Sequence, residues 1–204
     1  MAYSDFTTLT KVREAFGLTI EESIDLFTDL PEVLPSSYLQ TTLNENVFLA
    51  TAINTEKARS ELIIAPVLLE IRRIFNFKIG FFSGSEFNVD FQAGLSGYCD
   101  YILTASKESY EIRTPVVTLA EAKNESIKSG LGQCIAQMVA AQLFNQRNGD
   151  AIESIYGAVT TGTDWKFLKL TNKTIWIDKR DYFINEVSHL LGILITPFKD
   201  SQSQ

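Results

Sequence analysis

Residues 115–123, Pro-Val-Val-Thr-Leu-Ala-Glu-Ala-Lys, form an apolar run that ends in two charged side chains. The apolar part predicts a strand buried in a sheet. Because side chains alternate along a strand, Glu121 and Lys123 are expected on one face and Ala122 on the other. Charged side chains at the end of an apolar strand indicate a functional site, although a strand that has simply reached solvent has the same pattern.

A second expected strand, over residues 96–104, can pair with this run as an antiparallel hairpin across the polar loop 105–114. If the pairing is symmetric about that loop, Thr104 lies opposite Val117 and Asp100 lies opposite Glu121. Directly opposed β-carbons are roughly 4.5–5.5 Å apart, so the two carboxylates would repel each other. A divalent cation between them, or a raised pKa on one of them, relieves that repulsion. A register slip of one residue would move Asp100 to the other face.

Outward from this hairpin, the expected order is helix, three strands, helix, two strands, helix. Helices are expected over residues 4–30, 54–75 with a kink at Pro66, 131–146 and 181–194, and strands over residues 80–90, 96–104, 115–123, 154–161 and 166–178. This order predicts a single domain of α/β (α+β) class around one central sheet. We divide it into an N-terminal helical extension over residues 1–53, a core over residues 54–178, and a C-terminal helix and tail over residues 179–204.

The expected helices supply further candidate site residues. Apolar residues lie three, four and seven positions after Glu61, which predicts that Glu61 is on the core-facing side of its helix. A carboxylate there needs a partner, either in a site or as an ion pair with Arg59 or Arg72. Gln133 and Gln137 are four residues apart and share a helix face. Their amides either are solvated or, if that face meets the sheet near Glu121, orient a site residue.

The composition narrows the chemistry that these residues can perform. His189, Cys99 and Cys134 are too few and too scattered for a structural zinc site. The sequence contains neither a G-x-S-x-G elbow nor a phosphate-binding glycine loop. Any chemistry must therefore run on carboxylates, lysine, amides and, where needed, a hard metal ion.

The net charge and the lack of long apolar runs indicate which partners and which cellular compartment to expect. The net charge of −7 argues against a generic basic nucleic-acid binder. However, residues 1–60 hold nine acidic and four basic side chains, a net charge of −5. The remaining residues 61–204 carry a net charge of only −2 and are close to balanced. No apolar run approaches the length of a membrane span, and we see no secretory signal. We therefore expect a cytoplasmic protein without membrane contacts.

Four features together resemble the PD-(D/E)XK nuclease superfamily. They are Glu61 in a helix before the sheet, Asp100 in Gly97-Tyr98-Cys99-Asp100, Glu121-Ala122-Lys123, and Gln133 in the next helix. The resemblance covers roughly residues 54–178. It implies a restriction-endonuclease-like α-β-β-β-α-β core with a central mixed sheet flanked by helices. Residues 61–70 and Gly94-Leu95-Ser96-Gly97 are similar to bacterial, often cyanobacterial, members.

The resemblance implies a Mg²⁺-dependent phosphodiesterase that acts on nucleic acid, above all DNA, with Mn²⁺ as a substitute ion. Asp100, Glu121 and the carbonyl of Ala122 would hold the metal. Lys123 would orient the attacking water or stabilise the charge on the phosphate. Glu61 would bind a second metal or orient its waters, and Gln133 would support Lys123 or the phosphate.

Two alternatives to this interpretation stay open. One is a catalytically inactive nuclease-fold module for binding or complex assembly, which the acidic charge favours. The other is a structural ion pair of Lys123 with Glu121 or Asp100. The sequence also leaves open whether the protein forms a homo-oligomer.

Overall fold

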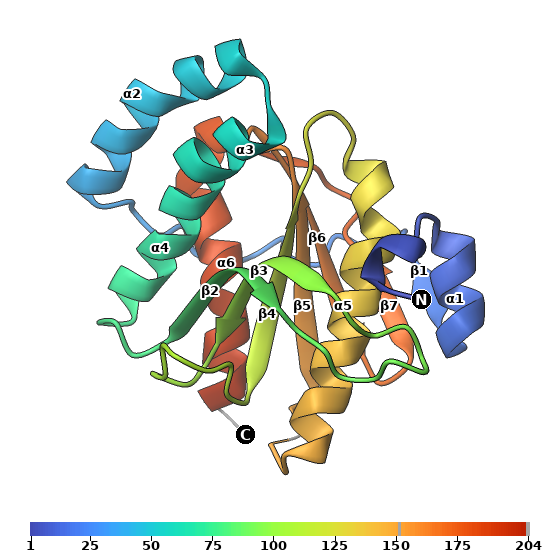
Figure 1. The fold of residues 1–204 in the computed structure, drawn as a ribbon. Coiled ribbons are helices and arrows are strands. Elements are labelled where there is room, and N and C mark those ends of the chain that lie inside the picture. The colour runs from blue at the N-terminus through green and yellow to red at the C-terminus, as the bar shows by residue number, and fades with distance from the viewer. Residues whose placement is uncertain (151, 203–204) are drawn as a thin grey trace.

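The computed structural model describes residues 1–150 and 152–202, and it is built around an eight-stranded mixed sheet (Figure 1). The strands are β1 (Thr19–Glu21), β2 (Gly80–Glu86), β3 (Tyr98–Thr104), β4 (Val116–Ala122), β5 (Ser154–Thr160), β6 (Asp164–Thr171), β7 (Thr174–Ile177) and β8 (Tyr182–Phe183). The helices are α1 (Leu9–Phe16), α2 (Ser37–Ile53), α3 (Glu56–Arg59), α4 (Ala65–Ile74), α5 (Ile127–Arg147) and α6 (Val187–Gln202), with the short helices η1 (Tyr3–Asp5), η2 (Ser60–Ile64) and η3 (Ile184–Glu186). The prediction of an α/β protein with one central sheet is confirmed.

The strands follow the order β1-β7-β6-β5-β4-β3-β2, with β8 paired to β6. Strands β2, β3 and β4 form an antiparallel meander, whereas β4 and β5 are parallel. A parallel pair needs a long crossover, and α5 provides it. Strands β5, β6 and β7 are again antiparallel, and β1 adds to β7 in parallel.

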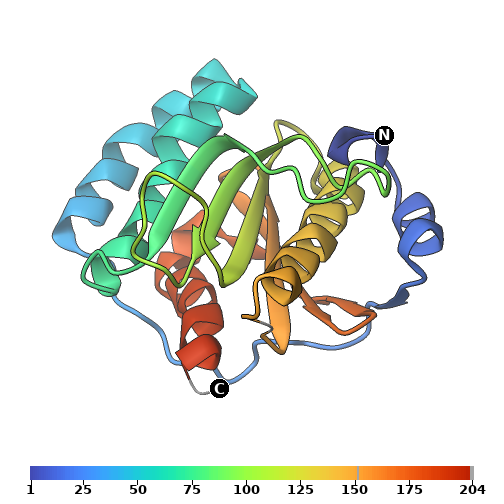
Figure 2. The ribbon, with the colours of Figure 1, turned by 60° about the horizontal axis from the view of Figure 1, so that its bottom comes forward.

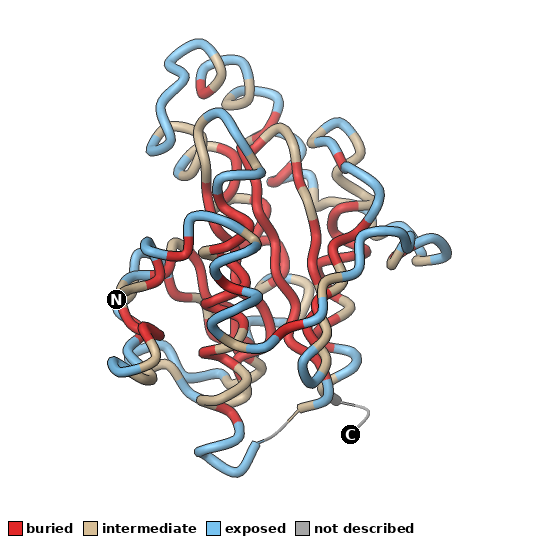
Figure 3. The backbone as a smooth tube through the Cα atoms, turned by 90° about the vertical axis from the view of Figure 1, so that its right-hand side faces the viewer, coloured by how far each residue is buried: buried red, intermediate tan, exposed pale blue. Residues whose placement is uncertain are grey.

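Helices cover both faces of the sheet (Figure 2). α5 and α1 pack on one face, over a core that includes Val12, Ile135 and Leu119. α4 and α6 pack on the other face and α2 packs against η2 and α4, in a core that includes Leu43 and Leu68. Every residue of β4 and β5 is buried, as the continuous buried traces at the centre of Figure 3 show. Burial on both faces explains why residues 115–122 are apolar almost without alternation.

The N-terminal region differs from the expected helix over residues 4–30. α1 ends at Gly17, which adopts a left-handed conformation with φ of 61°, and the chain then enters β1. A residue without a Cβ takes that conformation without strain, so the helix ends there. α2 covers Ser37–Ile53, where the sequence pattern predicts no separate helix. Residues 1–53 are therefore not a purely helical extension, because they contribute a strand to the sheet.

The predicted hairpin register is confirmed near the site and wrong at its other end. Tyr101 pairs with Ala120 and Ile102 with Leu119, as the symmetric pairing requires. The register shifts between Leu103 and Thr104, so Thr104 pairs with Val116 and not with Val117. An irregularity of this kind displaces the pairing by one residue locally and leaves the rest of the strand in register.

The expected helix over residues 54–75 contains a π-helical segment, η2, immediately before Pro66. Pro66 has no N–H for the carbonyl of Leu62, four residues earlier, and the side-chain amide of Asn46 on α2 donates to that carbonyl at 3.2 Å instead. The wide turn changes which residues face the sheet before Pro66. The hydrogen bond from Asn46 to the Leu62 carbonyl thus links α2 to η2 close to Pro66.

The C-terminal part begins differently from the expected helix over residues 181–194. Strand β8 and η3 come first, and α6 starts at Val187 and continues to Gln202. Residues 203 and 204 of the predicted tail lie outside the described residues. Within residues 1–150 and 152–202, no helix has the length and apolar character needed to span a bilayer.

Candidate functional site

Asp100, Glu121 and Lys123 come together where β3 begins and β4 ends. The Asp100 carboxylate accepts a hydrogen bond from the Ala122 amide at 2.8 Å, which ties it to the neighbouring strand. The Lys123 ammonium donates to Glu121 Oε1 at 2.6 Å. The pairing of Tyr101 with Ala120 places Asp100 one residue beyond the paired stretch, next to the end of β4.

Glu121 is the most deeply buried member of this group, with 1% of its surface exposed. Its second oxygen, Oε2, accepts a hydrogen bond from Gln137 Nε2 on α5 at 2.9 Å. Burial, followed by repulsion from Asp100, raises the pKa of Glu121 to about 7, although Lys123 and Gln137 favour the charged form. Without a further cation, the site thus holds a carboxyl group that titrates near neutrality.

The pKa values of Asp100 and Lys123 are also shifted. Burial raises the pKa of Asp100, and the Ala122 amide and Lys123 offset only part of that effect. For Lys123, burial alone would lower the pKa, but attraction to Glu121 and Asp100 outweighs it and the pKa is raised. Glu56 on α3 contributes to the same attraction. Lys123 is therefore held as a cation between acidic groups.

The position of Lys123 depends on its neighbours in the sheet and on α5. Its backbone N–H donates to the Thr160 carbonyl at 2.8 Å, which extends the parallel pairing of β4 and β5 by one residue. Its side chain crosses Gly130 on α5, where a Cβ would lie 3.1 Å from Lys123 Cγ and 2.7 Å from Val159 Cγ1. The glycine thus leaves the space that the lysine side chain occupies.

The α5 glutamine that contacts Glu121 is Gln137, one helical turn beyond Gln133. Gln137 is completely buried and Gln133 is half-buried. Gln137 Oε1 has no hydrogen-bond partner within the described part of the chain. The sequence pattern identified the correct helix face but not which of the two glutamines reaches the site, since that depends on how α5 packs on the sheet.

Glu61 is not on the core-facing side of its helix. Its side chain is 59% exposed and pairs with Lys57. Ser60 takes the inward position, with its Oγ 2.6 Å from the Tyr101 hydroxyl. The π-helical segment explains the difference, because the predicted stripe assumed α-helical spacing between Glu61 and Leu68. Of the acidic side chains on α3 and η2, Glu56 is the one whose charge acts on Lys123, and no pattern in the sequence indicates this.

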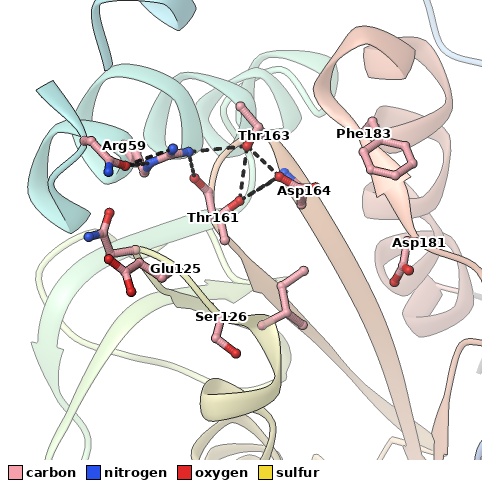
Figure 4. Close-up of a pocket in the computed structure, with 11 residues that line it drawn as sticks. Arg59, Glu125, Ser126, Thr161, Thr163, Asp164, Asp181 and Phe183 are labelled. Atoms are coloured by element: carbon pink, nitrogen blue, oxygen red, sulfur yellow. Dashed lines mark hydrogen bonds between the residues drawn. The ribbon is translucent and has the colours of Figure 1, made fainter. Parts of the chain in front are cut away.

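A polar cavity of about 710 Å³ lies at the carboxyl ends of β4 and β5, beside these residues. Its lining includes Asn54, Arg59, Asn124, Thr161, Asp164 and Phe183. Figure 4 shows Arg59 and Phe183 on opposite sides of the cavity, with Thr161, Thr163 and Asp164 between them. Loops at the carboxyl ends of parallel strands are a common place for ligand sites in α/β proteins.

The two cysteines and the histidine of the chain lie in packed surroundings. Cys99 and Cys134 are free and buried, and burial raises the pKa of both thiols. The His189 ring packs edge-on against Tyr182, with 5.4 Å between the ring centroids. None of the three belongs to the Asp100–Glu121–Lys123 group.

Within residues 1–150 and 152–202, no three His, Cys, Asp or Glu side chains are grouped closely enough to hold a metal ion among them. The carboxylates of the group come from two side chains, Asp100 and Glu121, and the charge of Glu56 on α3 also acts on Lys123. Mg²⁺ commonly binds through one or two carboxylates and keeps several waters, so two carboxylates and a backbone carbonyl suit it chemically.

No known family model matches the chain, and no curated protein matches it.

Proposed function

We propose that the protein is a Mg²⁺-dependent nuclease that hydrolyses phosphodiester bonds in nucleic acid, and in DNA first of all. The observation that carries the proposal is the group formed by Asp100, Glu121 and Lys123, with Gln137 behind it. A buried carboxylate, a half-buried carboxylate and a lysine at one end of a central strand can support metal-assisted attack on a phosphate.

The topology supports a restriction-endonuclease-like core. α4 precedes the antiparallel meander β2-β3-β4, and the α5 crossover leads to β5 in parallel with β4. This is the α-β-β-β-α-β order that the resemblance implies, with helices on both faces of a mixed sheet. In this proposal Asp100 comes from the second strand of the meander, and Glu121 and Lys123 come from the third.

The residues present fit a divalent cation. Asp100 and Glu121 both have raised pKa values, mainly through burial, so a nearby cation would stabilise their charged forms. Asp100, Glu121 and the Ala122 carbonyl would hold the ion. When bound, Mg²⁺ supplies Lewis acidity to the phosphate and lowers the pKa of a coordinated water.

The chain's own residues have distinct parts in this proposal. Lys123 stabilises negative charge that develops on the phosphate, because its ammonium group is already held at the site by Glu121. Gln137 fixes the orientation of Glu121 from behind, as residues that bond to metal ligands commonly do. Glu61 has no part in it, because its side chain is exposed and pairs with Lys57, and Gln137 takes the supporting part expected of Gln133.

The test is cleavage of plasmid and of labelled single-stranded and duplex DNA in Mg²⁺ or Mn²⁺. The wild-type protein should cleave at least one of them, and Lys123→Ala should slow cleavage by about 10²–10³. Lys107→Ala is the matched control, since Lys107 is exposed in the loop at the far end of the β3–β4 hairpin. Glu121→Ala should abolish both cleavage and the response to metal. Cleavage that survives Lys123→Ala unchanged contradicts the proposed site.

One observation favours a second candidate, the inactive nuclease-fold module. Both oxygens of Glu121 already have partners, Lys123 and Gln137, so the ion pair satisfies the buried charge without a metal. A thermal shift in millimolar Mg²⁺ separates the candidates, because an ion that binds the folded state raises Tm. A shift without cleavage favours the inactive module, and neither shift nor cleavage leaves a structural ion pair.

A further inference from the structure

The cavity lies directly next to the Asp100–Glu121–Lys123 group, on the side where β4 and β5 end. Lys123 and Thr160 are joined by a backbone hydrogen bond, and the residues that follow them, Asn124 and Thr161, both line the cavity. A phosphate held at Lys123 would therefore have its nucleotide next to this space. The volume of about 710 Å³ lies within the range of roughly 300–1,000 Å³ typical of small-molecule sites.

Arg59 is the cationic side chain of the cavity lining, and most of its N–H groups already have partners within the protein. Its Nη1 donates to the Thr161 carbonyl at 3.0 Å and to Thr163 Oγ1 at 3.3 Å. Its Nε and Nη2 both donate to Asn54 Oδ1, at 3.2 and 3.1 Å. The guanidinium group thus ties α3 to the β5–β6 turn and forms one wall of the cavity.

The other charged groups of the lining are acidic, although Asp181 pairs with Lys166 and Asp164 accepts hydrogen bonds from Thr161 and Thr163. Glu125, Asp164 and Asp181 bring carboxylates, and Asn124 Oδ1 is buried without a donor within the described part of the chain. A phosphate offers further acceptors and would be repelled by such a wall, whereas the exocyclic amino groups of nucleobases are donors. An amide oxygen left without a donor is costly, and a ligand donor would relieve that cost if the Asn124 side chain turned its oxygen towards the cavity.

Phe183 supplies an apolar face opposite Arg59 (Figure 4). It lies on β8, paired with Asp164, and its side chain remains 46% exposed. An exposed aromatic ring fixed on a strand at the edge of a polar cavity is the arrangement that proteins use to stack an unpaired base. Stacking tolerates any base, because every base has a π-face.

We propose that this cavity is a nucleobase subsite, in which one unpaired base stacks on Phe183 beside the phosphate to be cleaved. The inference rests on the proposed nuclease function and narrows its substrate to single-stranded or frayed nucleic acid. A base inside a duplex is paired and stacked, so it cannot enter the cavity unless it leaves the helix. The subsite also accounts for how an acidic protein binds nucleic acid, since stacking replaces part of the attraction that a basic surface would provide.

The experiment compares one labelled DNA strand of about 20 nucleotides, alone and annealed to its complement. Binding is measured by fluorescence anisotropy in EDTA, and cleavage is measured as kcat/KM in Mg²⁺. Phe183→Ala should weaken both for the single strand by at least about fivefold, the low end of what removing a stacking ring costs. Phe183→Trp should retain them.

Phe91→Ala is the matched control. Phe91 is 70% exposed, and its neighbour Asp90 is paired with Arg147 at the opposite end of α5 from the cavity. That variant should behave as the wild type does. All measurements use the full chain, and a thermal melt of each variant checks that it is folded.

The possible results separate the subsite from the nuclease function. Binding that depends on Phe183 but brings no cleavage supports the subsite and overturns the nuclease. Cleavage that favours the duplex, or that Phe183→Ala leaves unchanged, overturns the subsite and leaves the nuclease. A wild-type protein that neither binds nor cleaves either DNA overturns both.

Discussion

Gln137 and Glu121 form a side-chain contact between α5 and β4 that is closed to solvent on every side. The glutamine donates to one oxygen of the carboxylate while Lys123 holds the other. The three side chains thus fix one another, and the carboxylate has little freedom to rotate. Preorganisation of this kind is what a metal ligand or a catalytic group needs.

We expect Gln137→Ala and Gln133→Ala to differ sharply, although the two residues are one helical turn apart. Gln137→Ala removes the donor to a buried carboxylate and should lower the free energy of unfolding by about 1–3 kcal/mol. Gln133→Ala changes a half-buried side chain and should stay within about 0.5 kcal/mol of the wild type. Urea denaturation of the two variants at neutral pH measures the difference. Equal losses would contradict the role assigned to Gln137.

At the scale of the elements, the helix from Glu56 to Ile74 is shaped by Pro66. Its π-helical segment exposes Glu61 and turns Ser60 towards Tyr101. The carbonyl that Pro66 leaves without an N–H is satisfied from α2 by Asn46. The hydrogen bond from Asn46 adds a polar link to the packing of α2 on this helix, next to the proline.

A double-mutant cycle tests this coupling. Asn46→Ala should destabilise the wild type by about 1 kcal/mol, because the Leu62 carbonyl loses its donor. The same change in a Pro66→Ala background should cost less, since an alanine in place of the proline supplies an N–H to that carbonyl. The free energies of unfolding of the four proteins give the coupling directly. Thr51 on the same helix bonds only to α2 itself, so Thr51→Ala should show no coupling to Pro66.

At the scale of the whole molecule, the buried carboxyl group makes stability depend on pH. The pKa of Glu121 is about 7 in the folded protein, above its ordinary value of 4.5, so the folded state binds more protons than the unfolded state between those values. The free energy of unfolding should therefore fall as pH rises through this interval in the absence of metal. The contribution of Glu121 is on the order of 3 kcal/mol at most.

Glu121→Gln removes this titration, so its free energy of unfolding should fall less steeply than that of the wild type over the same interval. Asp100, whose pKa is also raised, keeps some of the slope in the variant. Urea denaturation at several pH values in EDTA measures both curves. Glu111→Gln, an exposed pair partner of Arg113, is the control and should leave the slope unchanged. Parallel curves for the wild type and Glu121→Gln would show that the carboxyl group titrates normally.

The sequence predicted the parts of this molecule that depend on local pattern. Alternation along residues 115–123 placed Glu121 and Lys123 on one face, and symmetric pairing brought Asp100 next to them. It did not predict which glutamine of α5 meets Glu121, because that depends on how the helix packs. The position of Glu61 was wrong because a π-helical turn breaks the 3.6-residue period on which the expectation rested.

The N-terminal region was predicted least well, for reasons of long-range packing. α2 has apolar residues on several sides, including the exposed Phe48, so no single stripe marked it as a helix. Strand β1 is three residues long and is recognisable only through its pairing with β7. Neither element can be read from periodicity, since each is defined by a partner far away in the chain.

That distant pairing has a consequence during synthesis on the ribosome. Thr19 in β1 pairs with Thr174 in β7. Strand β1 is therefore synthesised first but cannot pair until β7, one of the last strands, has emerged. Chain growth at about 5–20 residues per second would leave the apolar residues of the N-terminal region without their partners for several seconds or longer. We therefore expect the nascent chain to depend on protection by chaperones until β7 has left the exit tunnel.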